Sequence, residues 1–176
     1  MPNYGVIMGE AITVANLGAN RLVTGWGDPE DSLQSCAAVV LANPATGAAG
    51  LYHYPSGDID DRPAAQLLMT QMRDAVQPTE GYIVYGMVDY NRQGPDLPVP
   101  SDPFNAKLRD FVLRLLPLEC RLRRMPARTR VATVALNAGA IDITGAAPNP
   151  IQDLRNTLAG NYPYGRVYWD GTQNED

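Results

Sequence analysis

"SCAAVVLANPATGAAGLYHYP", residues 35–55, holds two nearly continuous runs of small apolar residues with a turn-forming stretch between them at 43–47. Apolar runs of this kind are typical of strands that are buried on both faces. The Asn, Pro and Gly between them favour a reversal of the chain. The stretch therefore predicts a buried β-hairpin at the centre of the fold. Antiparallel pairs are symmetric about their turn, so a turn at about 44–46 pairs residues whose numbers add up to roughly 89–90.

The predicted hairpin carries His53, the only histidine of the chain, and Cys36, one of its two cysteines. Their numbers add up to 89, so this register predicts that the two side chains face each other with Cβ atoms about 5 Å apart. An imidazole beside a thiol lowers the thiol pKa and favours the nucleophilic thiolate. The backbone N–H groups of Ser35 and Cys36 are candidates for stabilising an oxyanion. In the plain alternative, the cysteine is an apolar filler and the histidine is a core residue.

The rest of the chain predicts more strands and a few helices. Strands are indicated by "YGVIMGEAITVAN", "NRLVTGW", "EGYIVYGMVDY", "RVATVALNAGAIDITG" (two strands at a glycine turn) and "YGRVYWD". Helices are predicted to begin near 60–61, 101–102 and 149, each with a proline in its first turn. Strands grouped first, with helices inserted later, indicate an α+β fold. We expect a strand-rich, largely antiparallel, sandwich-like core flanked by about three helices, in a single domain over residues 1–176.

Charge and composition exclude several classes of partner. The net charge of −5 over 176 residues argues against binding to nucleic acid. No stretch approaches about 18 uninterrupted apolar residues, so membrane insertion is not expected. The N-terminus lacks the pattern of a secretory signal, which favours a cytoplasmic protein and leaves signal-independent secretion open. Two cysteines without a Cys/His cluster predict neither a disulfide framework nor a metal site.

Two charged stretches have a functional and a plain interpretation. "SGDIDDRP" places three carboxylates just after His53, and they form either a metal site or acid pair or, more simply, a solvated turn with a helix cap. Five arginines between positions 121 and 130 form either a solvated basic run or a surface that docks an acidic partner.

The hairpin segment also resembles a known signature. The signature consists of a Leu-Gly-Ser-Cys element, an apolar strand that ends in Asp-Pro or Asn-Pro, and a Gly-Gly-Met-x-His element. It is matched here by Leu33, Ser35, Cys36, Val40, Asn43, Pro44, Gly50 and His53. "MGEAITV" at 8–14 is similar to the opening strand of the same proteins, with its Gly-Glu pair. Over about residues 5–57 the chain thus resembles the CheD-like chemoreceptor glutamine deamidases. The wider group of cysteine deamidases, which includes bacterial deamidase toxins, shares the Cys-His arrangement.

This resemblance implies a cofactor-independent hydrolase with Cys36 as nucleophile and His53 as base. The substrate implied is a partner protein that presents a glutamine or asparagine side chain, which becomes Glu or Asp as ammonia leaves. The family usually has a catalytic Thr six residues before the cysteine, where this chain has Glu30. An insertion of about six residues after the strand makes Thr24 the implied third member, with Ser32 and Glu30 as alternatives. Gln34 stands where the family has Gly, which alters the backbone next to the nucleophile.

Several functions remain open at this level. The target is either a chemoreceptor, as in chemotaxis, or a host or rival protein attacked by an effector. A protein-binding module that keeps the fold but has lost the chemistry is the alternative from a different class. A thiol peptidase or acyltransferase uses the same Cys-His pair.

Overall fold

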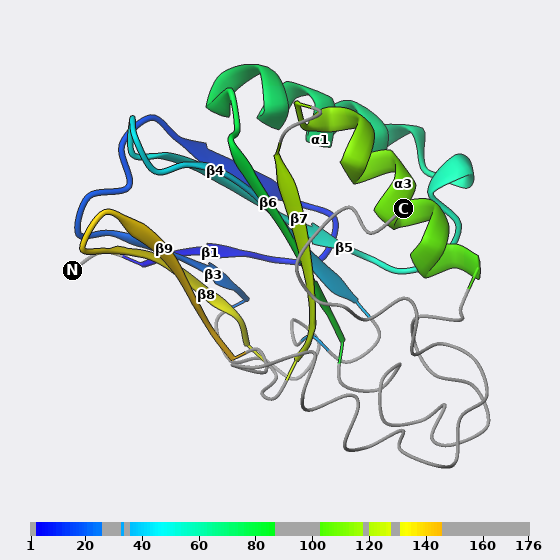
Figure 1. Cartoon of the computed structure of the whole chain (residues 1–176). Coiled ribbons are helices and arrows are strands. Elements are labelled where there is room, and N and C mark those ends of the chain that lie inside the picture. Colours follow the sequence, from blue (N-terminus) through cyan, green and yellow to red (C-terminus); the bar gives the residue numbers. More distant parts are fainter. Residues whose placement is uncertain are drawn as a thin grey trace, which may run out of the picture.

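The segment at 35–55 forms the central hairpin of a five-stranded sheet. Its strands are β4 (Ala37–Asn43) and β5 (Ala48–Tyr54), which pair antiparallel. Every residue of the two strands except Asn43 is buried, as expected for strands covered on both faces. The computed structural model describes residues 3–25, 33, 36–86, 103–117, 120–127 and 131–145 (Figure 1).

Two sheets and two helices make up the described fold. The larger sheet has the order β2-β5-β4-β6-β7 and is completed by β2 (Ala11–Val14), β6 (Glu80–Tyr85) and β7 (Arg121–Pro126). The smaller sheet has the order β1-β3-β8-β9, with β1 (Asn3–Val6), β3 (Arg21–Thr24), β8 (Thr133–Asn137) and β9 (Ala140–Thr144). The helical elements are the short 3-10 helix η2 (Ile59–Asp61), α1 (Pro63–Val76) and α3 (Pro103–Leu115).

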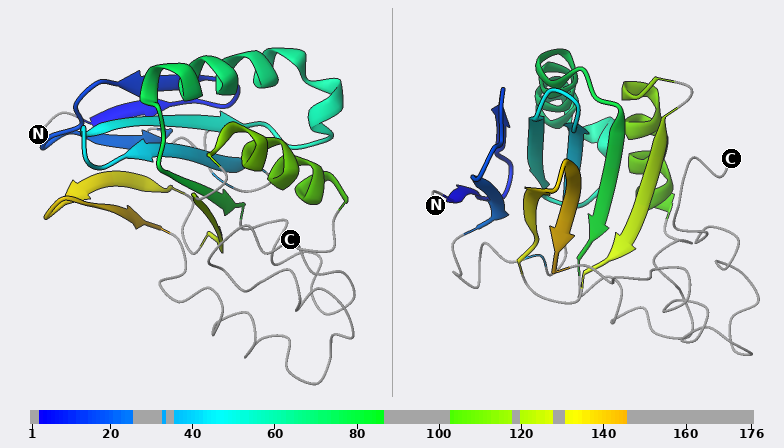
Figure 2. Two further views of the ribbon diagram at one scale, coloured as in Figure 1. Left: turned by 45° about the horizontal axis from the view of Figure 1, so that its top comes forward. Right: turned by 60° about the vertical axis from the view of Figure 1, so that its left-hand side comes forward.

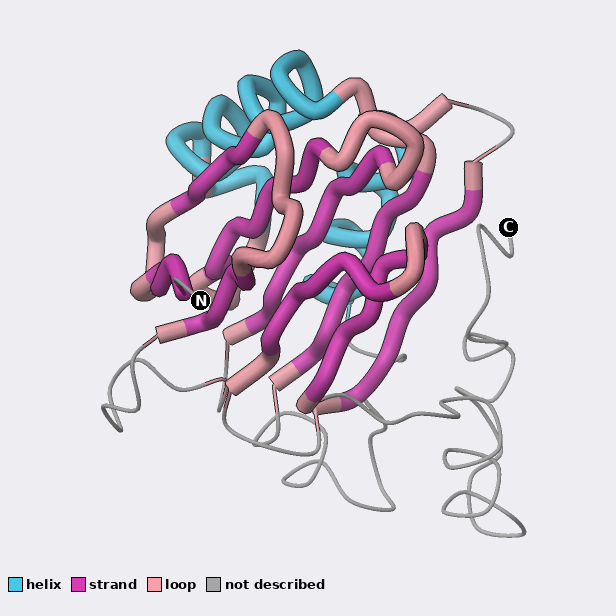
Figure 3. The backbone as a smooth tube through the Cα atoms, turned by 90° about the vertical axis from the view of Figure 1, so that its left-hand side faces the viewer, coloured by secondary structure: helices cyan, strands magenta, loops and turns pink. Residues whose placement is uncertain are grey.

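The hairpin separates two hydrophobic clusters because successive side chains of a strand point to opposite faces. Ala37, Val39 and Leu41 pack with buried residues of α1 and α3. Their neighbours Ala38 and Val40 pack instead with residues of the smaller sheet. The helices therefore cover one face of the large sheet and the small sheet covers the other, as Figures 2 and 3 show from different sides. Among the described residues, no helix has the length and apolarity needed to cross a bilayer.

The α+β class predicted from the sequence is confirmed, with differences in detail. The pairing is largely antiparallel, as predicted, but each sheet also contains one parallel pair, β1 with β3 and β6 with β7. The strand β7 was not predicted, and it contains part of the arginine run. The first predicted helix begins later, at Pro63, and the preceding turn is the separate helix η2. The helix predicted near 149 and the strand "YGRVYWD" lie outside the described residues.

Candidate functional site

The register of the hairpin differs from the predicted one. His53 pairs with Ala38, and Asn43 with Ala48, so paired residue numbers add up to 91. The loop between the strands holds four residues and ends at Gly47, whose φ of 83° and N–H bond to the Asn43 carbonyl complete the reversal. Only a residue that tolerates a positive φ fits there readily. The prediction that Cys36 lies directly opposite His53 is therefore wrong.

Cys36 and His53 nevertheless share a face of the hairpin. Cys36 lies two residues before Ala38, the partner of His53, so the two side chains are diagonal neighbours on adjacent strands. Cys36 belongs to the cluster between the two sheets, and His53 points the same way because it pairs with Ala38 of that cluster. Both residues are buried, with 5% and 0% of their surfaces exposed. The structure thus places a thiol and an imidazole on one face of the hairpin, between the sheets.

The segment between β1 and β2 holds His53. Nδ1 of the imidazole lies 3.0 Å from the Val6 carbonyl oxygen. A carbonyl oxygen only accepts hydrogen bonds, so Nδ1 carries the proton, and the neutral ring presents Nε2 as its acceptor. The backbone is fixed as well, because Gly9 N–H donates to the His53 carbonyl (2.8 Å) and His53 N–H donates to that of Glu10 (3.0 Å). In this tautomer Nε2 is the nitrogen that can act as a general base.

Thr24 ends β3 beside Val6, its partner in the parallel pairing. Its buried hydroxyl accepts a hydrogen bond from Ala132 N–H (2.9 Å) and lies 3.5 Å from the Ala132 carbonyl oxygen. The Val6 carbonyl also accepts from Gly25 N–H (2.9 Å). The structure therefore brings Thr24 next to the residue that holds the imidazole, while the acceptor at Nδ1 is a backbone carbonyl. The Thr24 hydroxyl also fastens β3 to the segment that leads into β8.

The remaining predicted site residues cannot all be placed. Glu30, Ser32 and Ser35 lie outside the described residues, as does Gln34. Cys36 comes directly before β4, at the end of the sandwich where β3 and β5 end. The contacts that sequence reasoning missed are made by the backbone of Val6, Gly9 and Glu10, and backbone groups leave no side-chain signature. The Gly-Glu pair in "MGEAITV" was the only available signal.

The turn at residues 55–57, just after His53, is held by hydrogen bonds from the side chains of Tyr54 and Arg62. Tyr54 O–H donates to the Gly57 carbonyl oxygen (2.6 Å), and Arg62 Nε donates to that of Ser56. Burial raises the pKa of Tyr54 to about 12, so the phenol stays protonated and remains a donor. Ser56 has a φ of 73°, a left-handed conformation that is uncommon for a residue other than glycine. These contacts keep the end of β5, and with it His53, in one position.

The three carboxylates beyond this turn have structural roles in the described molecule. Asp58 caps η2 by accepting from Asp60 N–H (2.9 Å). Lys107 of α3 bridges Asp58 and Asp60, with Nζ–Oδ2 distances of 2.8 and 3.0 Å. Within the described part of the chain, no group of three or more His, Cys, Asp or Glu residues is placed to hold a metal ion. The arrangement agrees with the interpretation as a turn and helix cap.

Lys107→Met is expected to give a small loss of thermal stability near neutral pH that shrinks in acid. The hydrogen bond from Lys107 holds the pKa of Asp58 below its ordinary value of 3.8. A carboxyl with a lowered folded-state pKa contributes stability above its unfolded pKa, and this is lost as the pH falls through the folded value. The measurement is the difference in Tm between wild type and variant from neutral pH to below 3.8. Lys107→Arg is the control that keeps the charge, and a difference independent of pH would contradict the expectation.

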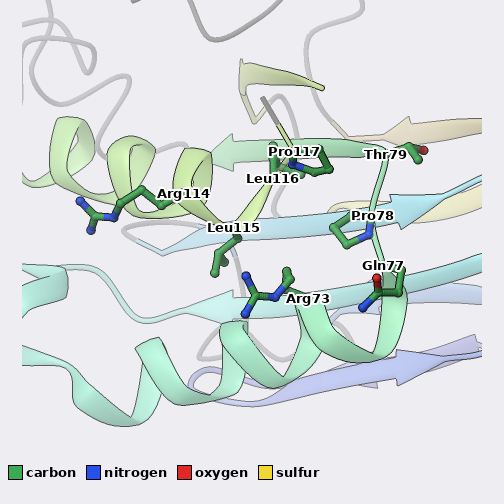
Figure 4. Close-up of a pocket in the computed structure, with 8 residues that line it drawn as sticks. All are labelled: Arg73, Gln77, Pro78, Thr79, Arg114, Leu115, Leu116 and Pro117. Atoms are coloured by element: carbon green, nitrogen blue, oxygen red, sulfur yellow. The ribbon is translucent and has the colours of Figure 1, made fainter. Parts of the chain in front are cut away.

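A separate cavity of about 420 Å³ lies where the ends of α1 and α3 meet the start of β6 (Figure 4). Two arginines, Arg73 and Arg114, lie at its walls, and the rest of the lining consists of two leucines, two prolines, Gln77 and Thr79. Arg73 is paired with Asp74 (2.7 Å), and Arg114 lies over the ring of Phe111. The cavity includes neither Cys36 nor His53, so it is not part of the candidate site.

No protein-family model matches the chain, and no curated protein matches its sequence.

Proposed function

We propose that the protein is a cysteine amidohydrolase that deamidates a glutamine or asparagine side chain of a partner protein. The observation that carries the proposal is the hydrogen bond between His53 Nδ1 and the Val6 carbonyl. This bond leaves Nε2 as the acceptor on the face of the hairpin that also carries Cys36. A buried thiolate is unfavourable in apolar surroundings unless a cation stands nearby, and an imidazolium is the cation that this face supplies.

The reaction needs only these two side chains and water. Nε2 takes the thiol proton, and the Cys36 sulfur attacks the side-chain carboxamide carbon to give a tetrahedral intermediate. The imidazolium returns the proton to the amide nitrogen, which leaves as ammonia, and a thioester remains on the sulfur. His53 then removes a proton from water, whose oxygen attacks the thioester and releases the carboxylic acid product and the thiol. Throughout the cycle Nδ1–H remains on the Val6 carbonyl, which orients the ring and stabilises its charged form.

The consequence for the partner is the gain of a negative charge where a neutral amide stood. A new carboxylate is sufficient to disrupt an interface or alter a helix end. A chemoreceptor and the target of an effector are both partners that such a change would switch. The two roles share this chemistry and differ only in the protein that presents the amide.

The test is the rate at which iodoacetamide alkylates Cys36 as a function of pH, in wild type and in His53→Ala. We expect a midpoint below the ordinary thiol value of about 8.5 in wild type and a higher one in the variant. At pH 7 the variant should react about tenfold more slowly, because removing the imidazole lowers the thiolate fraction. The mass of labelled peptides distinguishes Cys36 from Cys120, the other buried cysteine.

Cys120 serves as the control within the same molecule. It lies in the cluster beneath the helices, away from the face that carries His53. If His53→Ala merely loosened the fold, both cysteines would react faster. A midpoint at or above about 8.5 that is the same in both proteins would refute the proposal. The catalytically idle binding module would then be the better interpretation.

A further inference from the structure

The chain between β1 and β2 makes a tight bend at residues 6–10, which makes three polar contacts with His53. Val6 accepts from Nδ1, Gly9 donates to the His53 carbonyl, and Glu10 accepts from the His53 N–H. Glu10 N–H donates to the Ile7 carbonyl oxygen (3.0 Å) and closes the bend. The side chain and the backbone of His53 are thus held by one five-residue segment.

We propose that the bend at residues 6–10 is the positioning element of the site, with Gly9 as its positioning residue, and that it sets the tautomer of His53. This role rests on the function proposed above, because a fixed tautomer matters only if Nε2 acts as a base. In water a neutral histidine favours the tautomer that carries its proton on Nε2. In that tautomer Nε2 cannot accept the thiol proton. The bend reverses that preference by placing a carbonyl oxygen at Nδ1.

Gly9 is the residue on which the geometry of the bend depends. Its φ is +87°, a left-handed conformation in which a side chain is strained. A Cβ built at Gly9 meets no atom within 4 Å, so Gly9→Ala strains the backbone without a steric clash. The two side chains before Gly9 are exposed, Ile7 at 39% and Met8 at 52%, so the backbone around Gly9 can shift without displacing a core side chain. A relaxed bend would move the Gly9 N–H away from the His53 carbonyl, and His53 would then shift relative to the Val6 carbonyl, which Gly25 N–H also holds.

Gly139 offers a matched control. It has a φ of +79° at the turn between β8 and β9, and a Cβ there also meets nothing within 4 Å. Gly9→Ala and Gly139→Ala therefore impose a similar backbone strain, and we expect a similar loss of stability. Only Gly9→Ala should slow the alkylation of Cys36 by iodoacetamide at pH 7, by about threefold. Gly9→Asn should recover most of the rate, because Asn tolerates a positive φ.

The tautomer itself is measurable, because His53 is the only histidine and its ring nitrogens need no assignment. Nitrogen NMR of ¹⁵N-histidine-labelled Cys36→Ala at about pH 9, well above the ordinary histidine pKa of about 6.5, should show the proton on Nδ1. In the Gly9→Ala, Cys36→Ala double variant the signals should shift toward the other tautomer, and with Gly139→Ala they should not. This measurement uses a protein without the Cys36 thiol, so its result does not depend on whether the protein is a deamidase.

Two results would overturn the inference. One is a proton on Nε2 in the Cys36→Ala protein. The other is a Gly9→Ala protein in which the tautomer and the alkylation rate both match those of Gly139→Ala. Should Gly9→Ala fail to fold, the tautomer in Cys36→Ala still decides the question.

Discussion

Gly50→Ala is expected to lower the free energy of unfolding by about 1–3 kcal/mol, the usual cost of overpacking a core. Gly50 lies in β5 under α1, where an added Cβ would overlap Met72 Cγ and come within 2.6 Å of its Sδ. Met72 is buried to 1% exposure, so its side chain cannot swing into solvent. The measurement is urea denaturation of the two proteins, with the shift of the midpoint at constant slope giving the loss.

The same substitution should reverse its sign when Met72 is shortened. Met72→Ala alone is expected to cost about 2–5 kcal/mol, because it leaves a cavity. In that background Gly50→Ala adds a methyl group to the cavity and lowers the entropy of the unfolded chain, so it should stabilise by about 0.4–1 kcal/mol. Gly81→Ala is the control, since a Cβ there meets Leu116 Cδ1 at 2.7 Å rather than Met72. It should remain destabilising in the Met72→Ala background, and equal behaviour of the two glycines would contradict the packing shown here.

Among the residues that match the deamidase signature, some have a structural role and others are the candidates for chemistry. Asn43 donates from Nδ2 to the Gln77 carbonyl oxygen and so ties the hairpin turn to the end of α1. Gly50 permits α1 to approach β5 closely. Packing alone is a sufficient reason for these two residues. The chemical proposal concerns Cys36 and His53, the thiol and the imidazole on the face of the hairpin between the sheets.

The sequence predicted the hairpin well because its signal is local. Long runs of small apolar residues indicate buried strands, and Asn-Pro with a following Gly indicates the turn. The register was wrong because it depends on how many residues the loop holds, and this was settled by the positive φ of Gly47. In the observed register the position opposite Cys36 lies two residues after His53, beyond the end of β5. A shift by two residues keeps side chains on the same face of a strand, so Cys36 and His53 share a face although they are not directly paired.

The strand β7 and the support of His53 were missed for different reasons. An arginine-rich segment is usually interpreted as solvent-exposed. In β7, however, Arg124 is only 2% exposed and Leu122 is fully buried. Arg123 is exposed at this edge of the sheet, where charged side chains discourage pairing with other chains. The support of His53 comes from backbone groups of a segment more than 40 positions away, and no side-chain pattern encodes such a contact.

The second large effect separates the deamidase from a thiol peptidase. Consider two peptides of one sequence, one with a chloromethyl ketone in place of the glutamine side-chain amide and the other with that group at its C-terminal carbonyl. A deamidase must admit the side-chain carbonyl to the sulfur, whereas a peptidase must admit the main chain. We therefore expect the side-chain probe to label Cys36 faster by a factor on the order of 100, a ratio that a shaped pocket commonly achieves. Intact mass spectrometry gives the rate, and peptide mapping gives the site.

Both probes carry the same electrophile, so their intrinsic reactivity toward a thiol is matched and the ratio reports the site. His53→Ala should slow labelling by both, because the base acts on the sulfur whichever carbonyl arrives. Cys120 is the internal reference. It lies under the helices, away from the candidate site, so the two probes should label it at equal rates. Faster labelling by the main-chain probe would favour a peptidase or acyltransferase. Equal labelling of Cys36 by both, unaffected by His53→Ala, would mean that the hairpin carries a thiol with no shaped site around it.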